Sequence, residues 1–159
     1  MLAPIIKTIE VPCSQEKAFE VFLEMDSWWP LGKFTVSAYG GKPAKAIRVE
    51  AKQGGNIVEI GPDGTEYLWG TIKSYDPYDF VSMDFHIAPP GDETVDSRSL
   101  VEVRFTPLGT QRTRVVLTQS NWEAFGEKAA MLRDRGYGQA WVAIFEGAYK
   151  AACGSRAPA

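Results

Sequence analysis

Apolar and polar residues alternate along the chain with spacings that change from segment to segment, and each change marks an expected element. Residues 5 to 11 alternate with a period of two and stop at Pro12, which predicts a first strand. The next segment predicts a helix, because Ser14 is a suitable N-cap and apolar residues recur at helical spacing over residues 18 to 25. We expect this helix to end near Asp26.

The period of two returns at residue 46 and is interrupted by short segments rich in Gly, Pro, Asp and Asn. A polar loop over residues 88 to 99 is the longest interruption. Because the other connections are short turns, the strands between them are expected to pair as an antiparallel sheet. The six expected strands cover residues 46 to 51, 57 to 60, 65 to 75, 81 to 87, 100 to 105 and 114 to 118.

After Ser120 the spacing becomes helical. Residues 122 to 132 predict a modest helix, and from Gly136 onward apolar residues at steps of three or four form the longest amphipathic stripe in the chain. This last helix alone is long and aromatic enough to cover an apolar sheet face. The predicted fold is therefore α+β: a curved antiparallel sheet of about seven strands wrapped around a long C-terminal helix, with two short helices after the first strand.

Composition narrows the class of protein. The 159 residues fit a single domain over 1–159, with a core over about 5–152, and 45% apolar residues exclude a disordered chain. A net charge of −3 removes the usual electrostatic basis for binding nucleic acid or anionic lipid. No apolar run is long enough to span a membrane, and the N-terminus lacks the basic region of a signal peptide. We expect a cytoplasmic protein in which Cys13 and Cys153 are free thiols, with a disulfide between them as the alternative.

The order of these segments resembles the helix-grip superfamily of START and Bet v 1-like (SRPBCC) domains. Within it, the chain resembles the branch named after the activator of Hsp90 ATPase, in its stand-alone bacterial form. The resemblance covers about residues 5 to 152 and is carried by IEVPCSQEKAFEVF, WWP, VEAKQGGNIVEI, WGTIKSYDPYDFVSMDF, VEVRFTPLGTQRTRVVLTQSNW and GYGQAWVAIFEGAY. Ala140 precedes Trp141 where the family often has glycine, which should narrow the approach of the helix to the sheet slightly. The eukaryotic co-chaperone has a further docking domain for which this chain has no room, so stimulation of Hsp90 is not expected to carry over.

Aromatic residues gather in the segments that would face the space between helix and sheet. Apolar clefts with a few polar groups are typical of small-molecule sites, and aromatic rings pack on planar ligands. The same side chains would serve as core if no space were left. The expected ligand-binding residues are Trp28, Trp29, Met83, Phe85, Phe105, Trp122, Tyr137, Trp141 and Phe145, with the two adjacent tryptophans at the mouth. The first hypothesis is a protein that binds a small apolar molecule, aromatic or lipid-like, in this cavity without a cofactor or a metal.

Two alternatives stay open. One is an enzyme of the cyclase or aromatase type known in the superfamily, with Tyr137 orienting an enol or carbonyl. A tyrosine or carboxylate buried beside the cavity with a displaced pKa would favour that alternative. The other is an interaction module, a homodimer or a chaperone-associated protein. The sequence contains no paired acid and base that would identify catalytic residues, so binding is favoured over catalysis.

Strand alternation also predicts which side chains point outward. Trp69 has the parity of Lys73, which favours the outer face. There it would either pack under a loop or form, with Tyr67 and Tyr75, an exposed row that would suit a dimer contact. His86 is the only histidine in the sequence. It has the parity of Asp84, which predicts a surface position and argues against a histidine-centred metal site.

Overall fold

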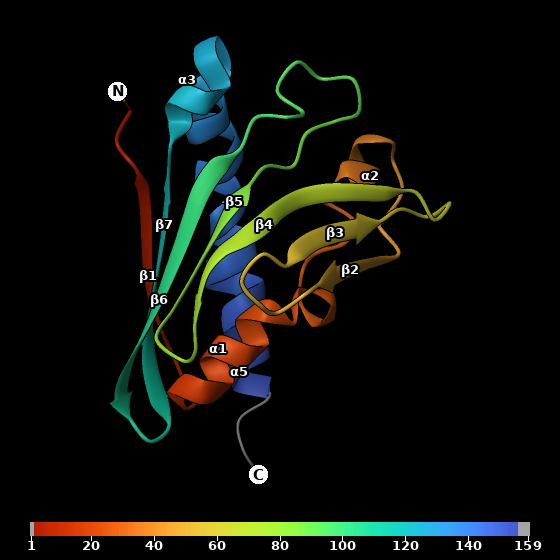
Figure 1. Cartoon of the computed structure of the whole chain (residues 1–159). Helices are drawn as coiled ribbons and strands as arrows, with labels where there is room; N and C mark the ends of the chain where they lie inside the picture. The colour runs from red at the N-terminus through yellow and green to blue at the C-terminus, as the bar shows by residue number, and fades with distance from the viewer. Residues whose placement is uncertain (1, 156–159) are drawn as a thin grey trace.

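The computed structural model describes residues 2–155 and contains a seven-stranded antiparallel sheet (Figure 1). The strands are β1 (Ile5–Val11), β2 (Ala46–Val49), β3 (Asn56–Ile60), β4 (Glu66–Asp76), β5 (Phe80–Phe85), β6 (Ser99–Gly109) and β7 (Arg112–Ser120). They lie in the order β1-β7-β6-β5-β4-β3-β2. The seven expected strands are confirmed. Strands β2 to β7 form a continuous meander, and β1 pairs with its last strand, β7.

Short helices follow β1, as predicted: α1 (Gln15–Leu23), η1 (Met25–Ser27) and α2 (Val36–Tyr39). The Ser14 hydroxyl caps α1 by accepting a hydrogen bond from the Lys17 backbone N–H at 3.2 Å. After β7 come η2 (Trp122–Lys128), α3 (Ala129–Met131), η3 (Leu132–Tyr137), α4 (Gly138–Trp141), η4 (Val142–Tyr149) and α5 (Lys150–Ser155). The segments from α3 to α5 are contiguous and form the long C-terminal helix, in which η3 and η4 have π-helical hydrogen bonding.

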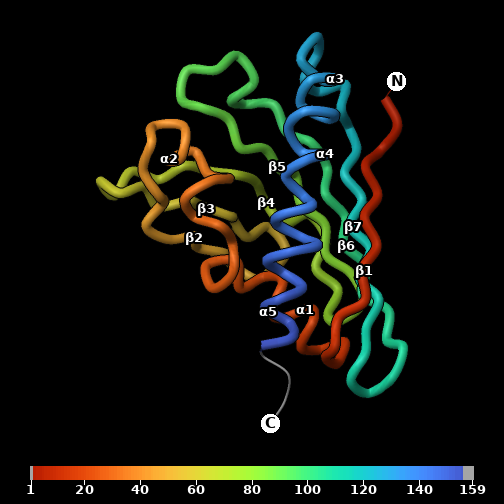
Figure 2. Tube along the Cα trace, turned by 180° about the vertical axis from the view of Figure 1, so that it is seen from behind, coloured from red at the N-terminus to blue at the C-terminus, as the bar shows by residue number. Residues whose placement is uncertain are grey.

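The C-terminal helix lies across the concave side of the sheet, and α1 lies beside its last turns (Figure 2). The Tyr149 hydroxyl joins the two helices by donating a hydrogen bond to the Ala18 carbonyl at 2.7 Å. Near this contact α1 fills the space between helix and sheet, because Phe22 packs on Tyr149 at 5.3 Å and on Phe105 of β6 at 6.1 Å. The expected helix-grip arrangement is confirmed, with a filled core at the α1 end.

The outward position predicted for Trp69 is wrong, since its side chain is fully buried. Ile57 of β3 pairs with Gly70 whereas Val58 pairs with Leu68, so β4 carries an extra residue at Trp69. Such a bulge interrupts the strict alternation of side chains between the two faces. As a result Trp69 and Ile72 are both buried, and the exposed aromatic row predicted for a dimer contact is not formed.

The surface position predicted for His86 is also wrong, because its side chain is only 3% exposed. β5 ends at Phe85, so the alternation that placed His86 beside Asp84 no longer applies to it. The ring contacts Phe125 of η2 at 4.5 Å and is hydrogen-bonded to Thr94 in the loop after β5. That loop and η2 together bury the histidine.

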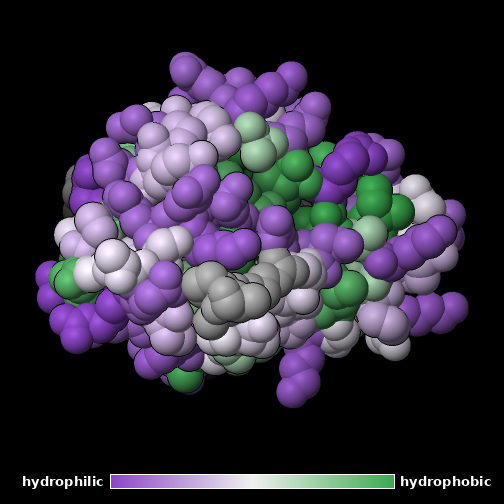
Figure 3. Space-filling view, turned by 90° about the horizontal axis from the view of Figure 1, so that it is seen from below, coloured by the Kyte–Doolittle hydropathy of each residue, from purple (hydrophilic) through white to green (hydrophobic). Residues whose placement is uncertain are grey.

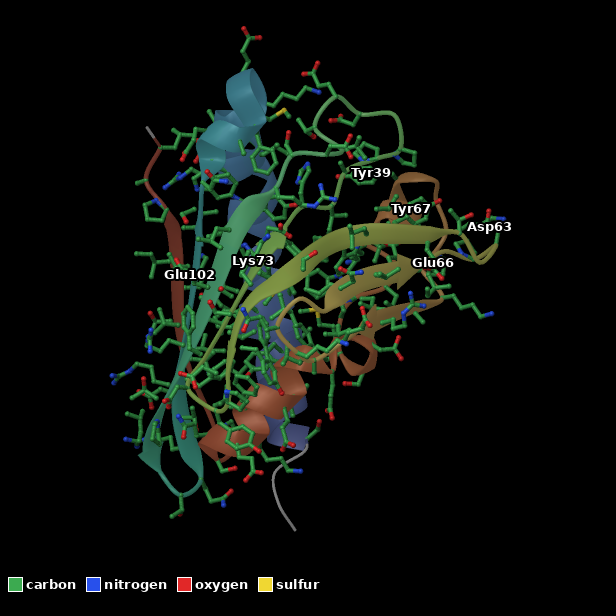
Figure 4. The ribbon with its side chains drawn as sticks, viewed as in Figure 1. Tyr39, Asp63, Glu66, Tyr67, Lys73 and Glu102 are labelled. Carbon is green, nitrogen blue, oxygen red and sulfur yellow. The ribbon has the colours of Figure 1, made fainter. Side chains whose placement is uncertain are left out.

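The outer surface carries mostly polar residues. Lys73 forms an ion pair with Asp84 at 3.2 Å on the outer side of the sheet, where Figure 4 also places Glu102. Seen from the end where α1 and α5 lie, polar residues cover much of the surface and apolar residues gather on the side of β2 and β3 (Figure 3). Among residues 2–155, no helix has the length and apolar character needed to cross a membrane.

Cys13 and Cys153, from opposite ends of the chain, lie together in the core. Neither forms a disulfide and both are fully buried. A hydrogen bond from Cys153 lowers the pKa of the Cys13 thiol below its ordinary value. The two residues therefore hold the turn after β1 against α5 without a disulfide.

Candidate functional site

A cavity of about 390 Å³ lies between the C-terminal helix, residues 29–39 and the end of β5. Its volume is within the range of about 300–1,000 Å³ that small-molecule sites occupy. The sheet contributes only Phe85 and the adjoining Ile87, whereas the helix contributes residues from Leu132 to Ile144. The space is therefore at the α2 end of the helix and sheet interface, opposite the filled core at α1.

Four of the nine predicted ligand-binding residues line this cavity: Trp29, Phe85, Tyr137 and Trp141. The other five, Trp28, Met83, Phe105, Trp122 and Phe145, are buried but do not line it. Trp28 and Phe105 pack on Phe22 of α1, and Trp122 packs on Phe125 and on the side of Tyr137. A role in ligand binding stays a prediction for all nine.

The two adjacent tryptophans have different surroundings. Trp28 donates its indole N–H to the Val21 carbonyl at 2.7 Å and packs on Tyr149, so it belongs to the core. Trp29 donates its indole N–H to the Phe34 carbonyl at 2.8 Å and lines the cavity. One tryptophan thus anchors the segment, and the other forms part of the cavity wall.

Trp141 forms the neighbouring part of the wall, with its ring edge to face against Trp29 at 6.2 Å, and is held by a buried polar chain. Its indole N–H donates to Gln119 Oε1 at 2.7 Å, and Gln119 Nε2 donates to the Ser99 hydroxyl at 2.9 Å. Ser99 in turn donates to the Phe85 carbonyl at 2.6 Å. This chain fixes the indole before any ligand arrives.

A second buried chain leads from the loop after β5 to Tyr137. The Asp92 carboxylate lies 2.6 Å from the Thr94 hydroxyl, which lies 2.9 Å from His86 Nε2, and His86 Nδ1 lies 2.8 Å from the Tyr137 hydroxyl. Because a carboxylate only accepts, Thr94 donates to Asp92 and accepts from His86 Nε2–H. His86 Nδ1 is then the acceptor for the Tyr137 O–H.

The protonation states of this chain follow from burial. Burial lowers the pKa of His86 to about 4, aided by the charge of Arg98 and opposed by that of Asp92. Burial raises the pKa of Tyr137 well above its ordinary value. Near neutral pH both groups are therefore uncharged, as the direction of the hydrogen bonds requires. The Tyr137 oxygen also accepts the Ile87 backbone N–H at 2.8 Å.

Glu59 holds part of the cavity wall in place, and the sequence analysis missed it. Its buried carboxylate accepts hydrogen bonds from the backbone N–H groups of Val36 at 2.7 Å and Ser37 at 2.8 Å, and from the Ser37 hydroxyl. These residues begin α2, whose Ala38 and Tyr39 line the cavity. Glu59 therefore positions one wall of the site. The sequence did offer an indication: Glu59 is two residues after Ile57 in β3, so strand alternation places both side chains on the inner face.

The described part of the chain, residues 2–155, contains no group of three or more His, Cys, Asp or Glu side chains placed to hold a metal ion. The chemistry that the site itself offers is aromatic packing, hydrogen bonding and the proton-bearing chain behind Tyr137.

No family model matches this sequence, and no curated protein does. Among solved structures the chain is similar to Txn09, an anthrahydroquino-γ-pyrone synthase, with 27% identity and a TM-score of 0.61 over 97% of this chain and 96% of that chain. It is also similar to CalC, a self-sacrificing resistance protein from Micromonospora echinospora, with 24% identity and a TM-score of 0.73 over 98% and 97% of the two chains.

The Hsp90 activator PFC0360w from Plasmodium falciparum is a further structural neighbour, with 17% identity and a TM-score of 0.50 over 76% of this chain and 74% of that chain. These three neighbours have different functions and share the architecture described above. They do not single out the Hsp90 activator branch within the superfamily. The chain has the helix-grip fold of the START and Bet v 1-like superfamily.

Proposed function

We propose that this protein binds a flat, largely apolar small molecule in the cavity that Trp29 and Trp141 line. The observation that supports the proposal is the cavity itself, about 390 Å³ in volume and walled by aromatic rings. The indole N–H groups of both tryptophans and the Tyr137 hydroxyl are already bonded to protein acceptors. Ring surface is therefore what these residues offer to a ligand, and planar molecules pack on it favourably.

The walls are held in place without a ligand, which favours binding. Glu59 secures α2, Gln119 secures Trp141 and the Phe34 carbonyl secures Trp29. A preorganised site loses less conformational entropy when a ligand enters.

The test is a fluorescence titration of the protein with bicyclic and tricyclic aromatic molecules. Binding is expected to change the tryptophan emission, and Trp141→Ala is expected to weaken the affinity at least about tenfold by removing a wall. Because Trp141→Ala also removes the partner of Gln119, Ala140→Phe gives a second test, in which a new ring occupies the cavity. Trp122→Phe is the matched control, since Trp122 is buried but does not line the cavity. Unchanged emission across the panel, or equal affinities in all variants, would contradict the proposal.

A cyclase-type enzyme is the second candidate. It is favoured by the buried chain from Asp92 to Tyr137, by the raised pKa of that tyrosine, and by the similarity to Txn09. In this function the Tyr137 hydroxyl, backed by neutral His86, would exchange protons with an enolisable ketone in the cavity. Against it, both hydrogen-bonding partners of the hydroxyl are at present protein groups.

Proton exchange tests the enzyme directly. The α-protons of 1-tetralone, a bicyclic aromatic ketone, are followed by NMR in deuterated water with and without the protein. Faster exchange that is lost in both Tyr137→Phe and His86→Gln would support catalysis. Exchange at the rate of buffer alone would count against it.

A further inference from the structure

The cavity has two cationic residues in its lining and no carboxylate. Lys33 reaches it from the segment before α2 and Arg135 from η3, and both are exposed at its mouth. Within residues 2–155 neither side chain forms an ion pair. The chain as a whole has a net charge of −3, so the charge at this cavity is opposite in sign to that of the whole chain.

Few other polar groups in the lining are available to a ligand. The Thr35 hydroxyl donates to the Leu31 carbonyl at 3.0 Å and accepts the Ala38 N–H at 3.1 Å. The polar atoms of Trp29, Trp141 and Tyr137 are bonded to protein, as described above. The Tyr39 hydroxyl and the Gln139 amide also line the cavity, but its charged groups are Lys33 and Arg135. These two are donors only and therefore require an acceptor on the ligand.

Neighbouring charges do not cancel this positive field. Asp92 is the carboxylate that acts on cavity residue Tyr39, where it and burial raise the pKa of the phenol. Asp92 itself is paired with Lys128 at 3.4 Å and accepts the Thr94 hydroxyl. The charge of Arg98 also acts on Tyr137, where it opposes the rise in pKa that burial causes. The electrostatic environment of the cavity thus favours an anion.

We propose that the ligand is an aromatic anion, a flat ring system that carries a carboxylate or an ionised phenol or enol. Its rings would pack against Trp29 and Trp141, and its charged oxygen would accept hydrogen bonds from Lys33 and Arg135. The inference rests on the proposed binding in this cavity and adds the charge of the ligand. Charge-assisted hydrogen bonds of this kind are stronger than neutral ones, and guanidinium matches a carboxylate in geometry.

The experiment compares 2-naphthoate with 2-naphthamide, which have nearly the same shape and differ in charge. Affinities are measured by calorimetry at low salt and at about 0.5 M salt, where exposed charges are strongly screened. We expect 2-naphthoate to bind at least about tenfold more tightly at low salt, and the preference to shrink at high salt.

Paired variants assign the preference to residues. In Lys33→Met/Arg135→Met the preference for 2-naphthoate is expected to fall below about twofold, while the affinity for 2-naphthamide changes little. Lys45→Met/Arg114→Met removes the same charge from exposed sites outside the cavity and is expected to keep the preference. If both probes bind equally, or if the preference survives in the cavity variant, the anion inference is overturned and cavity binding stands. If neither probe binds, the proposed binding of flat aromatic molecules is overturned as well.

Discussion

Glu59 and Trp69 form a hydrogen bond in the core, with Trp69 Nε1 donating to Glu59 Oε1 at 3.0 Å and both side chains fully buried. The same carboxylate accepts the N–H groups that begin α2. A buried carboxylate is tolerated when such donors satisfy it. The pair therefore connects the bulge in β4 to the wall of the cavity.

We expect Glu59→Gln to destabilise the protein, because an amide nitrogen cannot accept the hydrogen bonds that one carboxylate oxygen now accepts. The expected loss is about 2–4 kcal/mol in the free energy of unfolding, measured with urea. Glu66→Gln is the control, since Glu66 pairs with Arg48 on the surface, where such pairs contribute about 1 kcal/mol or less. Equal losses in the two variants would contradict the structural role of Glu59.

Trp122 and Trp141 are both buried, but their indole N–H groups differ. Within residues 2–155 the Trp122 N–H has no hydrogen-bond partner, whereas Trp141 donates to Gln119. Replacing Trp141 by Phe leaves the buried Gln119 amide oxygen without its donor. The expected cost is about 1–3 kcal/mol in the free energy of unfolding, beyond the lost packing. Trp122→Phe removes an unsatisfied donor, so it should destabilise the protein less. The two variants are compared by thermal unfolding. A larger loss of stability for Trp122→Phe would contradict the hydrogen-bonding difference between the two indoles.

His86 makes stability depend on pH. Its pKa is about 4 in the folded protein, against 6.5 for an ordinary histidine. Between these values the unfolded chain binds a proton that the folded protein does not, so stability falls as the pH drops from 6.5 to 4. The histidine accounts for a loss on the order of 3 kcal/mol over this window. The measurement is the difference in unfolding free energy between wild type and His86→Gln at several pH values. A difference that does not change with pH would contradict burial of a neutral His86.

Gly70 lies in the bulge of β4 against β5. A Cβ atom at this position would lie 1.7 Å from the Asp84 carbonyl oxygen. Gly70→Ala therefore forces the two strands apart and should cost about 3 kcal/mol, the upper end of the usual cost of overpacking. Gly109→Ala is the control, because a Cβ there meets nothing within 4 Å. The two variants are compared by urea unfolding. Similar unfolding midpoints would contradict the close approach of Gly70 to the Asp84 carbonyl.

The sequence alone was sufficient to predict the strands and the C-terminal helix, because each has a regular spacing of apolar residues. It also identified Trp29, Phe85, Tyr137 and Trp141, which line the cavity. Alternation failed at Trp69 and at His86, since one is in a bulge and the other follows the end of a strand. At both residues the regular alternation of side chains between the two sheet faces is interrupted, by the bulge at Trp69 and by the end of β5 before His86.

Local pattern therefore determined which segments become strands and helices and in what order they pair, since backbone geometry sets those periods within a few residues. Only the tertiary structure decided where the helix and sheet separate. That depends on α1 filling one end while α2, held by Glu59, leaves space at the other. The burial of His86 and the meeting of Lys33 and Arg135 at one cavity were likewise decided by contacts between distant segments, which no local spacing encodes.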